Sequence, residues 1–82
     1  MVAFVAPGSG KVAFVAGRRV GGAVVRNRAR RVLRAAWQQL RLRAGGDIDV
    51  VLVARVAIRG AKTQDLVTEL DELLTHARVL RP

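Results

Sequence analysis

The sequence contains no cysteine and no tyrosine, and its 82 residues include one histidine and one serine. Without cysteine there are no disulfides, no thiolate zinc sites and no cysteine nucleophiles. Ser9 lies in a tight turn and His76 lies near the C-terminus, so no base is positioned beside a serine nucleophile. We therefore expect no catalytic residue and no metal site on the chain itself.

Long apolar runs and targeting sequences are also missing. Nothing approaches the roughly 20 consecutive apolar residues of a membrane span. The apolar residues 1–6 have no basic segment before them and end at Pro7, so they do not form a signal peptide. We expect a single domain, residues 1–82, with no membrane association. The absence of cysteine favours a cytoplasmic location.

Acidic residues are absent from the first 46 positions, which carry a net +10, whereas residues 47–82 carry −1, giving +9 for the chain. The ten basic residues are Lys11, Arg18, Arg19, Arg26, Arg28, Arg30, Arg31, Arg34, Arg41 and Arg43. Codon bias toward arginine explains the choice of Arg over Lys but not the missing acids. Because 51% of the residues are apolar, the chain can bury a hydrophobic core and is not a disordered basic tail. The pattern indicates a polyanionic partner, and a nucleic acid is favoured over an anionic membrane surface.

Short valine-rich runs predict the strands. Residues 2–6 and 11–16 flank a Pro-Gly-Ser-Gly turn and predict an antiparallel hairpin. Residues 47–54 are too few for a helix and predict a central strand buried on both faces. We expect Thr63 to cap a last helix, with Asp65 in its first turn. Its expected inner face consists of Leu66, Val67, Leu70, Leu73, Leu74 and Ala77. The order β-β-α-β-α predicts an α+β fold (an α/β sandwich), a small mixed sheet with helices packed on it.

The stretch from Ala23 to about Arg43 contains no Gly or Pro and has helical spacing. Its apolar positions recur every three or four residues: Val25, Ala29, Leu33, Ala36 and Leu40. A basic stripe lies roughly 120–130° around the helix: Arg26, Arg30 and Arg34, with Asn27 and Arg31 beside it. The helix therefore has a core face and a cationic face, and two glycines at 45 and 46 are expected to end it.

Two acidic residues and the histidine have weaker functional interpretations. Asp47 and Asp49 lie two apart on the expected strand and so share a face that in principle suits Mg²⁺. Solubility at the strand start, or charge balance at the preceding helix end, is favoured over a metal site. His76 is expected to be a solvated helix residue.

The densest pattern runs from Arg18 to Arg34: RRVGGAVVRNRARRVLR. It resembles the signature of the bacterial ribonuclease P protein subunit, in which two basic residues precede Gly-Asn-Ala-Val and an Arg-Asn-Arg core precedes further basic residues. The matching positions are Arg26, Asn27 and Arg28 in the core, together with Ala23, Val24, Arg31 and Arg34. The resemblance extends to the strands on either side and to the leucine-rich last helix, and so covers essentially the whole chain.

Some positions depart from the family pattern. Gly22 replaces an Asn and removes a possible helix cap, Arg30 replaces a Lys, and Ala35 replaces a Glu. The family normally begins with a basic segment and helix before the first strand, whereas this sequence begins at that strand. That segment supplies aromatic residues to the cleft for the substrate's 5′ leader. We therefore expect near-normal assembly with RNA but a reduced preference for precursor over mature tRNA.

The resemblance implies a left-handed crossover between two parallel strands and a reaction centre that belongs to an RNA subunit holding Mg²⁺. It implies the protein subunit of an RNA-based endoribonuclease, which binds the catalytic RNA and precursor tRNA and promotes removal of the 5′ leader. No cofactor bound by the protein and no stable protein partner are expected. The alternatives are a basic RNA-binding module of ribosomal type and a protein-only nuclease, which the shortage of His and paired carboxylates disfavours.

The predicted RNA-binding residues are Arg18, Arg19, Arg26, Asn27, Arg28, Arg30, Arg31 and Arg34. Arginine forks make bidentate phosphate contacts. Asn27 either orients an arginine, contacts a sugar hydroxyl or bonds a neighbouring loop. Arg28 lies away from the stripe, toward a different RNA element or the sheet end. Possible leader contacts are Lys11, Phe14 and Trp37, where Phe14 lines the cleft or fills the core and Trp37 packs in the core or stacks on a base.

Overall fold

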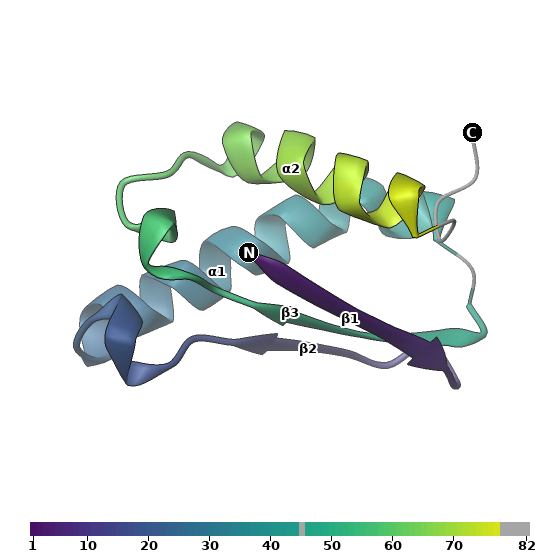
Figure 1. Ribbon diagram of the computed structural model, residues 1–82, viewed down its shortest axis with the longest axis horizontal. Coiled ribbons are helices and arrows are strands. Elements are labelled where there is room, and N and C mark those ends of the chain that lie inside the picture. The colour runs from purple at the N-terminus through teal and green to yellow at the C-terminus, as the bar shows by residue number, and fades with distance from the viewer. Residues whose placement is uncertain (45, 78–82) are drawn as a thin grey trace.

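The computed structural model describes residues 1–44 and 46–77. Its strands are β1 (Val2–Pro7), β2 (Val12–Val15) and β3 (Ile48–Val53), and its α-helices are α1 (Ala23–Leu40) and α2 (Thr63–His76). Three short 3₁₀ turns, η1 (Arg18–Val20), η2 (Arg41–Arg43) and η3 (Val56–Ile58), connect them. Figure 1 shows the sheet with both helices on the same side of it. The predicted α+β fold with a small mixed sheet is confirmed, and no helix in the described residues is long and apolar enough to span a membrane.

The strand order is β1-β3-β2, so the predicted hairpin of the first two strands is wrong. Strand β3 lies between them, antiparallel to β1 and parallel to β2. If β1 and β2 paired with each other, the strongly apolar β3 would lie at a sheet edge, with one side of its backbone unpaired. In the central position β3 forms backbone hydrogen bonds with a strand on each side. Helix α1 carries the chain from the end of β2 back to the start of β3, as a crossover between parallel strands requires. The left-handed sense of that crossover stays an expectation from the resemblance.

The turn between β1 and β2 is held against the start of β3. The carboxylate of Asp49 accepts hydrogen bonds from the backbone N–H groups of Ser9 at 3.0 Å and Lys11 at 2.9 Å. Gly10 adopts a positive φ of 90°, and a Cβ there would lie 2.9 Å from the carbonyl oxygen of Gly46. The turn therefore packs closely against the segment that leads into β3, and Asp49 has a structural role.

This arrangement predicts an acid-dependent loss of stability. The pKa of Asp49 lies below its usual value of 3.8, chiefly because the N–H of Lys11 donates to the carboxylate. A lowered pKa in the folded state stabilises the fold at pH values above about 4, and this contribution is lost as the pH falls through the folded pKa. We expect Asp49→Asn, which keeps an acceptor oxygen, to melt with less acid dependence than the wild type below pH about 4. Parallel melting curves for the two proteins between pH about 5 and 2 would contradict this assignment.

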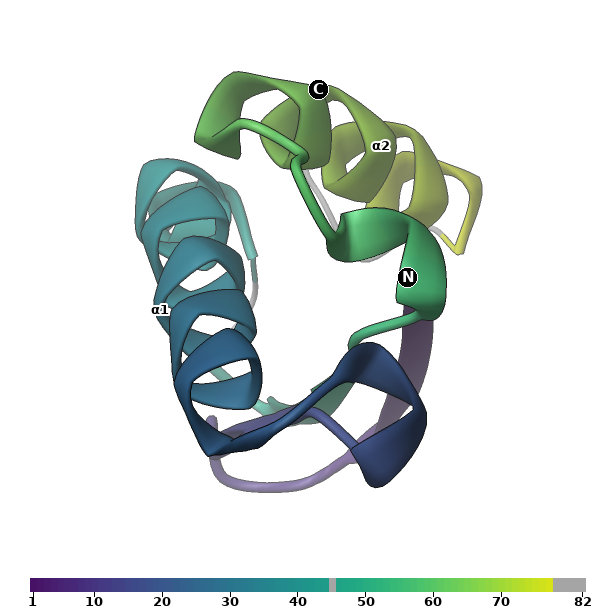
Figure 2. The same cartoon turned by 90° about the vertical axis from the view of Figure 1, so that its left-hand side faces the viewer.

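The sheet is covered on one face only. Val50 and Leu52 of β3 point toward the helices and are buried, whereas Val51 and Val53 point the other way and are half-buried. In Figure 2, α1 lies on the left and α2 at the top, both on the same face of the sheet, and no helix of the described residues lies on its opposite face. The expectation that β3 is buried on both faces is therefore wrong, because both helices pack on the same face.

Helix α1 buries the face that its spacing predicts. Ala29, Leu33, Ala36 and Leu40 are buried, and Val25 is half-buried and packs against the same core. The α-helix ends at Leu40 rather than near Arg43, because residues 41–43 tighten into the 3₁₀ turn η2. Gly45, expected to help end the helix, lies outside the described residues.

Helix α2 differs from its prediction at the start and along one edge. Lys62, in extended conformation, is the N-cap residue, and its N–H donates to the Asp65 carboxylate at 3.1 Å, so Thr63 is the first helical residue rather than the cap. The predicted residues Leu66, Val67, Leu70 and Leu74 are buried. Leu73 and Ala77 are exposed, contrary to prediction. At 100° per residue Leu73 lies roughly 75° from the centre of the buried stripe, and Ala77 follows the end of the helix.

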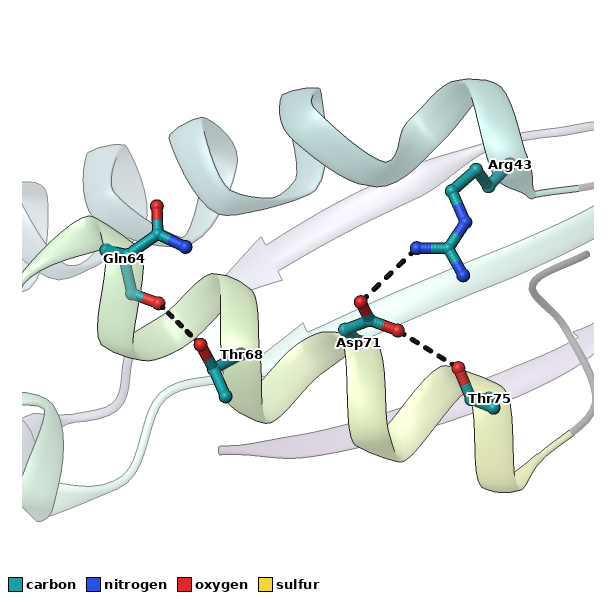
Figure 3. Close-up of polar contacts among 5 residues, drawn as sticks. All are labelled: Arg43, Gln64, Thr68, Asp71 and Thr75. Atoms are coloured by element: carbon teal, nitrogen blue, oxygen red, sulfur yellow. Dashed lines mark hydrogen bonds and ion pairs between the residues drawn. The ribbon is translucent and has the colours of Figure 1, made fainter. Parts of the chain in front are cut away.

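Side chains on the outer surface tie the end of α1 to α2. Figure 3 shows Arg43 of η2 donating to the Asp71 carboxylate at 3.2 Å, and the Thr75 hydroxyl donating to the same carboxylate at 3.0 Å. One turn earlier the Thr68 hydroxyl donates to the carbonyl oxygen of Gln64 at 3.2 Å. Both ends of the Arg43–Asp71 pair are partly exposed, so we expect it to orient η2 more than to stabilise the fold.

Candidate nucleic-acid interface

Four polar side chains on the solvent side of α1 surround a shallow hollow of about 430 Å³. We call these residues the arginine face: Asn27, Arg30, Arg31 and Arg34. They occupy successive turns of the helix, and all four were predicted from the sequence. None of the lining residues is acidic, so three guanidinium groups converge without an acidic residue among them. Closely spaced arginines of this kind suit the phosphates of a folded RNA, where they form bidentate hydrogen bonds.

Asn27 orients an arginine of this face. Its side-chain oxygen accepts a hydrogen bond from the guanidinium of Arg30, three residues later on the helix. This contact is the first of the three roles predicted for Asn27. Because Asn27 is neutral, it fixes Arg30 without cancelling the positive charge available to a phosphate.

The two outer arginines of the Arg-Asn-Arg core have different surroundings. Arg26 is half-buried, and its buried Nε has no hydrogen-bond partner among the described residues. Arg28 donates to the carbonyl oxygen of Ala61 at 3.1 Å, in the segment before α2. Arg28 thus makes an intramolecular contact beyond β3, rather than at the sheet end itself. A contact of Arg28 with RNA stays a prediction.

Arg18 and Arg19 lie on η1, away from the arginine face. Together with Arg55 they line a separate hollow of about 400 Å³ near the carboxyl ends of β2 and β3. The rest of its lining is largely apolar, with Val15 and Val56 exposed. The predicted RNA-binding residues therefore do not form one continuous site, but lie on α1 and at this end of the sheet.

A third hollow, of about 400 Å³, lies between β2 and the C-terminal half of α1. We call it the strand–helix hollow, and its side walls include Val12, Phe14, Arg34, Trp37, Gln38, Arg41 and Leu42. Phe14 and Trp37 are half-buried, so each packs against the core and also lines the hollow. The packing of both residues against the core is therefore confirmed, whereas a contact of either ring with RNA stays a prediction. Lys11, predicted beside them, is exposed in the turn before β2 and does not line the hollow.

The side chain of Arg34 is shared by two of the hollows that α1 lines. Its Cζ lies 5.5 Å from the centroid of the Phe14 ring, within the range of a cation–π contact. Arg34 lines the strand–helix hollow and also belongs to the arginine face. A ligand that binds one hollow is therefore adjacent to the other.

Sequence reasoning missed two features of this surface. Gln38, Arg41 and Leu42 extend the lining of the strand–helix hollow, and the helical spacing of Arg34, Gln38 and Arg41 was the signal that places them on one side. Phe4 was also missed: its side chain is 60% exposed on the uncovered face of the sheet. Only the strand pairing reveals Phe4, because an aromatic residue in a β-run is equally typical of a core.

The chain offers no obvious metal centre in its described residues. No group of three or more His, Asp or Glu side chains comes together there. The carboxylate of Asp49, one of the two candidate ligands, already accepts the N–H groups of Ser9 and Lys11. The structure thus favours the loop-holding role of Asp49 over metal binding.

The sequence of this chain is similar to those of known proteins. Residues 1–78 match the model of the Ribonuclease P family. The chain belongs to the ribonuclease P protein family. The ribonuclease P protein component of Shouchella clausii is 37% identical over 65 residues, which are 79% of this chain and 53% of that protein. Those of Dehalococcoides mccartyi (37% over 70 residues) and Symbiobacterium thermophilum (39% over 71 residues) are covered to 57% and 62% of their length. The chain thus spans little more than half the length of these relatives.

Solved structures of the ribonuclease P family share the fold. The Staphylococcus aureus RNase P protein, determined at 2.0 Å, superposes with a TM-score of 0.75 at 18% identity, over 96% of this chain and 75% of that one. A mutant of the same protein with defective mRNA degradation activity gives a TM-score of 0.76 at 20% identity, over 95% and 69% of the two chains. At this identity the comparison establishes the fold alone.

Proposed function

We propose that this chain is the protein subunit of ribonuclease P, which binds the catalytic RNA and precursor tRNA and promotes removal of the tRNA 5′ leader. The observation that carries the proposal is the arginine face, a cluster of three guanidinium groups with no acidic lining residue, in a chain of the ribonuclease P family. Such a face suits a polyanion and offers no group that activates water.

In this proposal the chain supplies binding, and the RNA supplies the chemistry. The arginine face docks on phosphates of the RNA subunit, where Asn27 holds Arg30 in position. The hollow at η1, with Arg18 and Arg19, adds a second cationic contact at the far end of β2. The Mg²⁺ ions of the reaction are held by RNA, and the complex acts in the cytoplasm as an endoribonuclease that leaves 5′-phosphate ends.

One assay tests the proposal directly. Precursor tRNA is incubated at low Mg²⁺ concentration with the RNA subunit alone, with the chain alone, and with both together. We expect cleavage at the mature 5′ end to be fast only with both, because the cationic face reduces the repulsion between two RNAs. Cleavage by the highly purified chain alone, abolished by Asp47→Asn or His76→Ala, would instead indicate a protein-only nuclease.

A basic RNA-binding module of ribosomal type gives a different result in the same assay. Such a protein would bind the RNA subunit with similar salt dependence but leave the cleavage rate at low Mg²⁺ unchanged. Binding without stimulation would therefore contradict the proposed function while leaving the arginine face as an RNA contact.

A further inference from the structure

We propose that two copies of this chain associate through the outer edge of β1, where β1 pairs antiparallel with the β1 of a second copy about a two-fold axis at Phe4. The partner is therefore another copy of the same chain, which the sequence alone does not predict. The inference goes beyond the proposed function and does not rest on it, because it concerns the protein in the absence of RNA.

The first argument is the free edge of β1. Within the part of the chain that the structure describes, β1 has a strand on one side only, because β3 lies between β1 and β2. Edge strands of soluble proteins usually carry charges or prolines that block further pairing. Strand β1 contains no charged residue, its last four residues are exposed, and its single proline is at its end. Its edge is therefore open to a further strand.

The hydrogen bonds to β3 show which backbone groups of β1 point outward. The N–H of Gly8 donates to the carbonyl oxygen of Asp47 at 2.9 Å, one step beyond the last register pair of the two strands. Opposite residues of antiparallel strands alternate between bonded and non-bonded pairs, so every second residue of β1, counted back from Gly8, bonds to β3. The residues between them direct their backbone groups toward the free edge: Ala3, Val5 and Pro7.

The pairing on the other side of β3 agrees with this assignment. Val50 lies opposite Val5, and its N–H donates to the carbonyl oxygen of Lys11, just before β2, at 2.9 Å. Val50 therefore bonds toward β2, and Val5 directs its backbone groups the other way. Pro7 has no N–H, so Ala3 and Val5 are the outward residues that offer both a donor and an acceptor.

The second argument is that this edge is complementary to itself. When two β1 strands run antiparallel about Phe4, the Ala3 of each copy lies opposite the Val5 of the other, and each such pair exchanges two N–H···O bonds. The two Phe4 residues form the non-bonded pair on the axis, where opposite side chains are closest. Phe4 is 60% exposed on the uncovered face of the sheet, so this aromatic pair removes apolar surface from water.

The third argument is the distribution of charge. Figure 2 shows β1 (purple) on the opposite side of the molecule from α1, which carries the arginine face. Helix α2, which contacts β1, contains no Lys or Arg and carries four acidic residues: Asp65, Glu69, Asp71 and Glu72. Pairing through β1 therefore brings together the least basic parts of two copies. The edge of β2 lies beside α1, where Arg34 is 5.5 Å from the ring of Phe14, so positive charge opposes self-association there.

The direct test is sedimentation equilibrium of the wild-type chain without RNA, at concentrations up to about 1 mM. Two bonded pairs and one aromatic pair make a small interface, so we expect a reversible dimer whose population rises with concentration. Each copy carries +9, so salt, which screens their repulsion, is expected to strengthen the dimer, whereas it weakens RNA binding. A chain that stays monomeric over the whole range overturns the inference.

A matched pair of variants distinguishes the edge of β1 from the open face of the sheet. Phe4→Lys places two like charges opposite each other on the axis and is expected to weaken the dimer roughly tenfold. Val15→Lys adds the same charge on β2, on the other side of β3, and is expected to leave the dimer unchanged. Both side chains are exposed, so both variants are expected to melt close to the wild type at low concentration. If Val15→Lys weakens the dimer as much as Phe4→Lys, the sheets pack face to face and the edge pairing is wrong.

The absence of cysteine allows the register to be measured. In Phe4→Cys the introduced thiol is the only one in the chain, and the Cα atoms of a non-bonded antiparallel pair are about 4.5 Å apart, within the range of a disulfide. Phe4→Cys is expected to form a covalent dimer under mild oxidation roughly tenfold faster than Val15→Cys, whose thiol is exposed but far from the axis. Equal rates for the two variants would contradict a two-fold axis at Phe4, even for a chain that dimerises.

Discussion

Replacing Arg30, Arg31 and Arg34 together with alanine is expected to weaken binding of the RNA subunit about a hundredfold at moderate salt. Each arginine lines the same hollow on α1, and each lost phosphate contact costs on the order of 1 kcal/mol, so three contacts amount to about two decades in affinity. The salt dependence of RNA binding is also expected to weaken in the triple variant. Each neutralised phosphate contributes about 0.7 to 0.9 to the slope of log affinity against log salt, so the slope flattens by roughly 2 to 3.

The control for this experiment is Arg59→Ala. Arg59 is exposed after η3 and lines neither the hollow of the arginine face nor the strand–helix hollow, so its removal lowers the net charge without touching the arginine face. We expect its salt slope to match the wild type within one unit. If a single Arg59→Ala substitution flattens the slope as much as the triple variant does, binding follows net charge rather than the arginine face.

The contribution of Asn27 to RNA binding is tested separately from that of the arginines. Because Asn27 holds the Arg30 guanidinium but carries no charge, Asn27→Ala is expected to reduce affinity without changing the salt slope. Arg30→Ala, by contrast, is expected to reduce the affinity and also to flatten the salt slope.

Helix α1 was predictable from the sequence because its determinants are local. The apolar positions Ala29, Leu33, Ala36 and Leu40 repeat at helical spacing, and burial of these four residues confirms the predicted core face. The arginine face follows from the same geometry, because the helix turns by a fixed angle at each residue. The arginine face is therefore predictable from the sequence to the same extent as the helix that carries it.

The strand pairing was not predictable in the same way. Two valine-rich runs about a Pro-Gly-Ser-Gly turn are typical of a hairpin, and nothing local reveals that β3, more than 30 residues later, lies between them. The carboxylate of Asp49 belongs to this same non-local event, because it bonds the turn only once β3 is in place. Its role in holding the turn was therefore missed, because the sequence alone favoured strand-start solubility or charge balance at the helix end, with a metal site as the weaker alternative.

The strand–helix hollow shows a further limit of sequence reasoning. Phe14 and Trp37 were recognised as residues with two possible roles, yet their shared place depends on how β2 packs under α1. Gln38 and Arg41 lie on the correct side of the helix by spacing alone, but spacing does not show that a hollow is there. Tertiary packing creates the hollow, which no local pattern in the sequence reveals.

Truncating Leu33 is expected to bring the whole domain close to unfolding. Leu33 is fully buried at the centre of the core, and removal of a buried leucine side chain costs about 3 to 5 kcal/mol, because the surrounding atoms do not close the cavity. A domain of 82 residues has a total free energy of unfolding of roughly 4 to 12 kcal/mol. Leu33→Ala therefore removes a large part of the stability, and urea titration followed by circular dichroism measures the loss as a lower midpoint at unchanged slope.

The chain supplies its own control for that substitution in Leu42, which is 88% exposed. Leu42→Ala deletes the same atoms from the surface and is expected to change the free energy of unfolding by less than about 0.5 kcal/mol. The two variants thus distinguish a buried leucine of α1 from an exposed leucine of η2. Leu33→Ala lowers RNA binding only through the population of folded protein, so its affinity recovers when stability is restored at lower temperature. Leu42 forms part of the strand–helix hollow, so any change in RNA affinity caused by Leu42→Ala occurs in a fully folded protein. Equal midpoints for the two variants would mean that the packing of α1 against the sheet does not carry the stability of the fold.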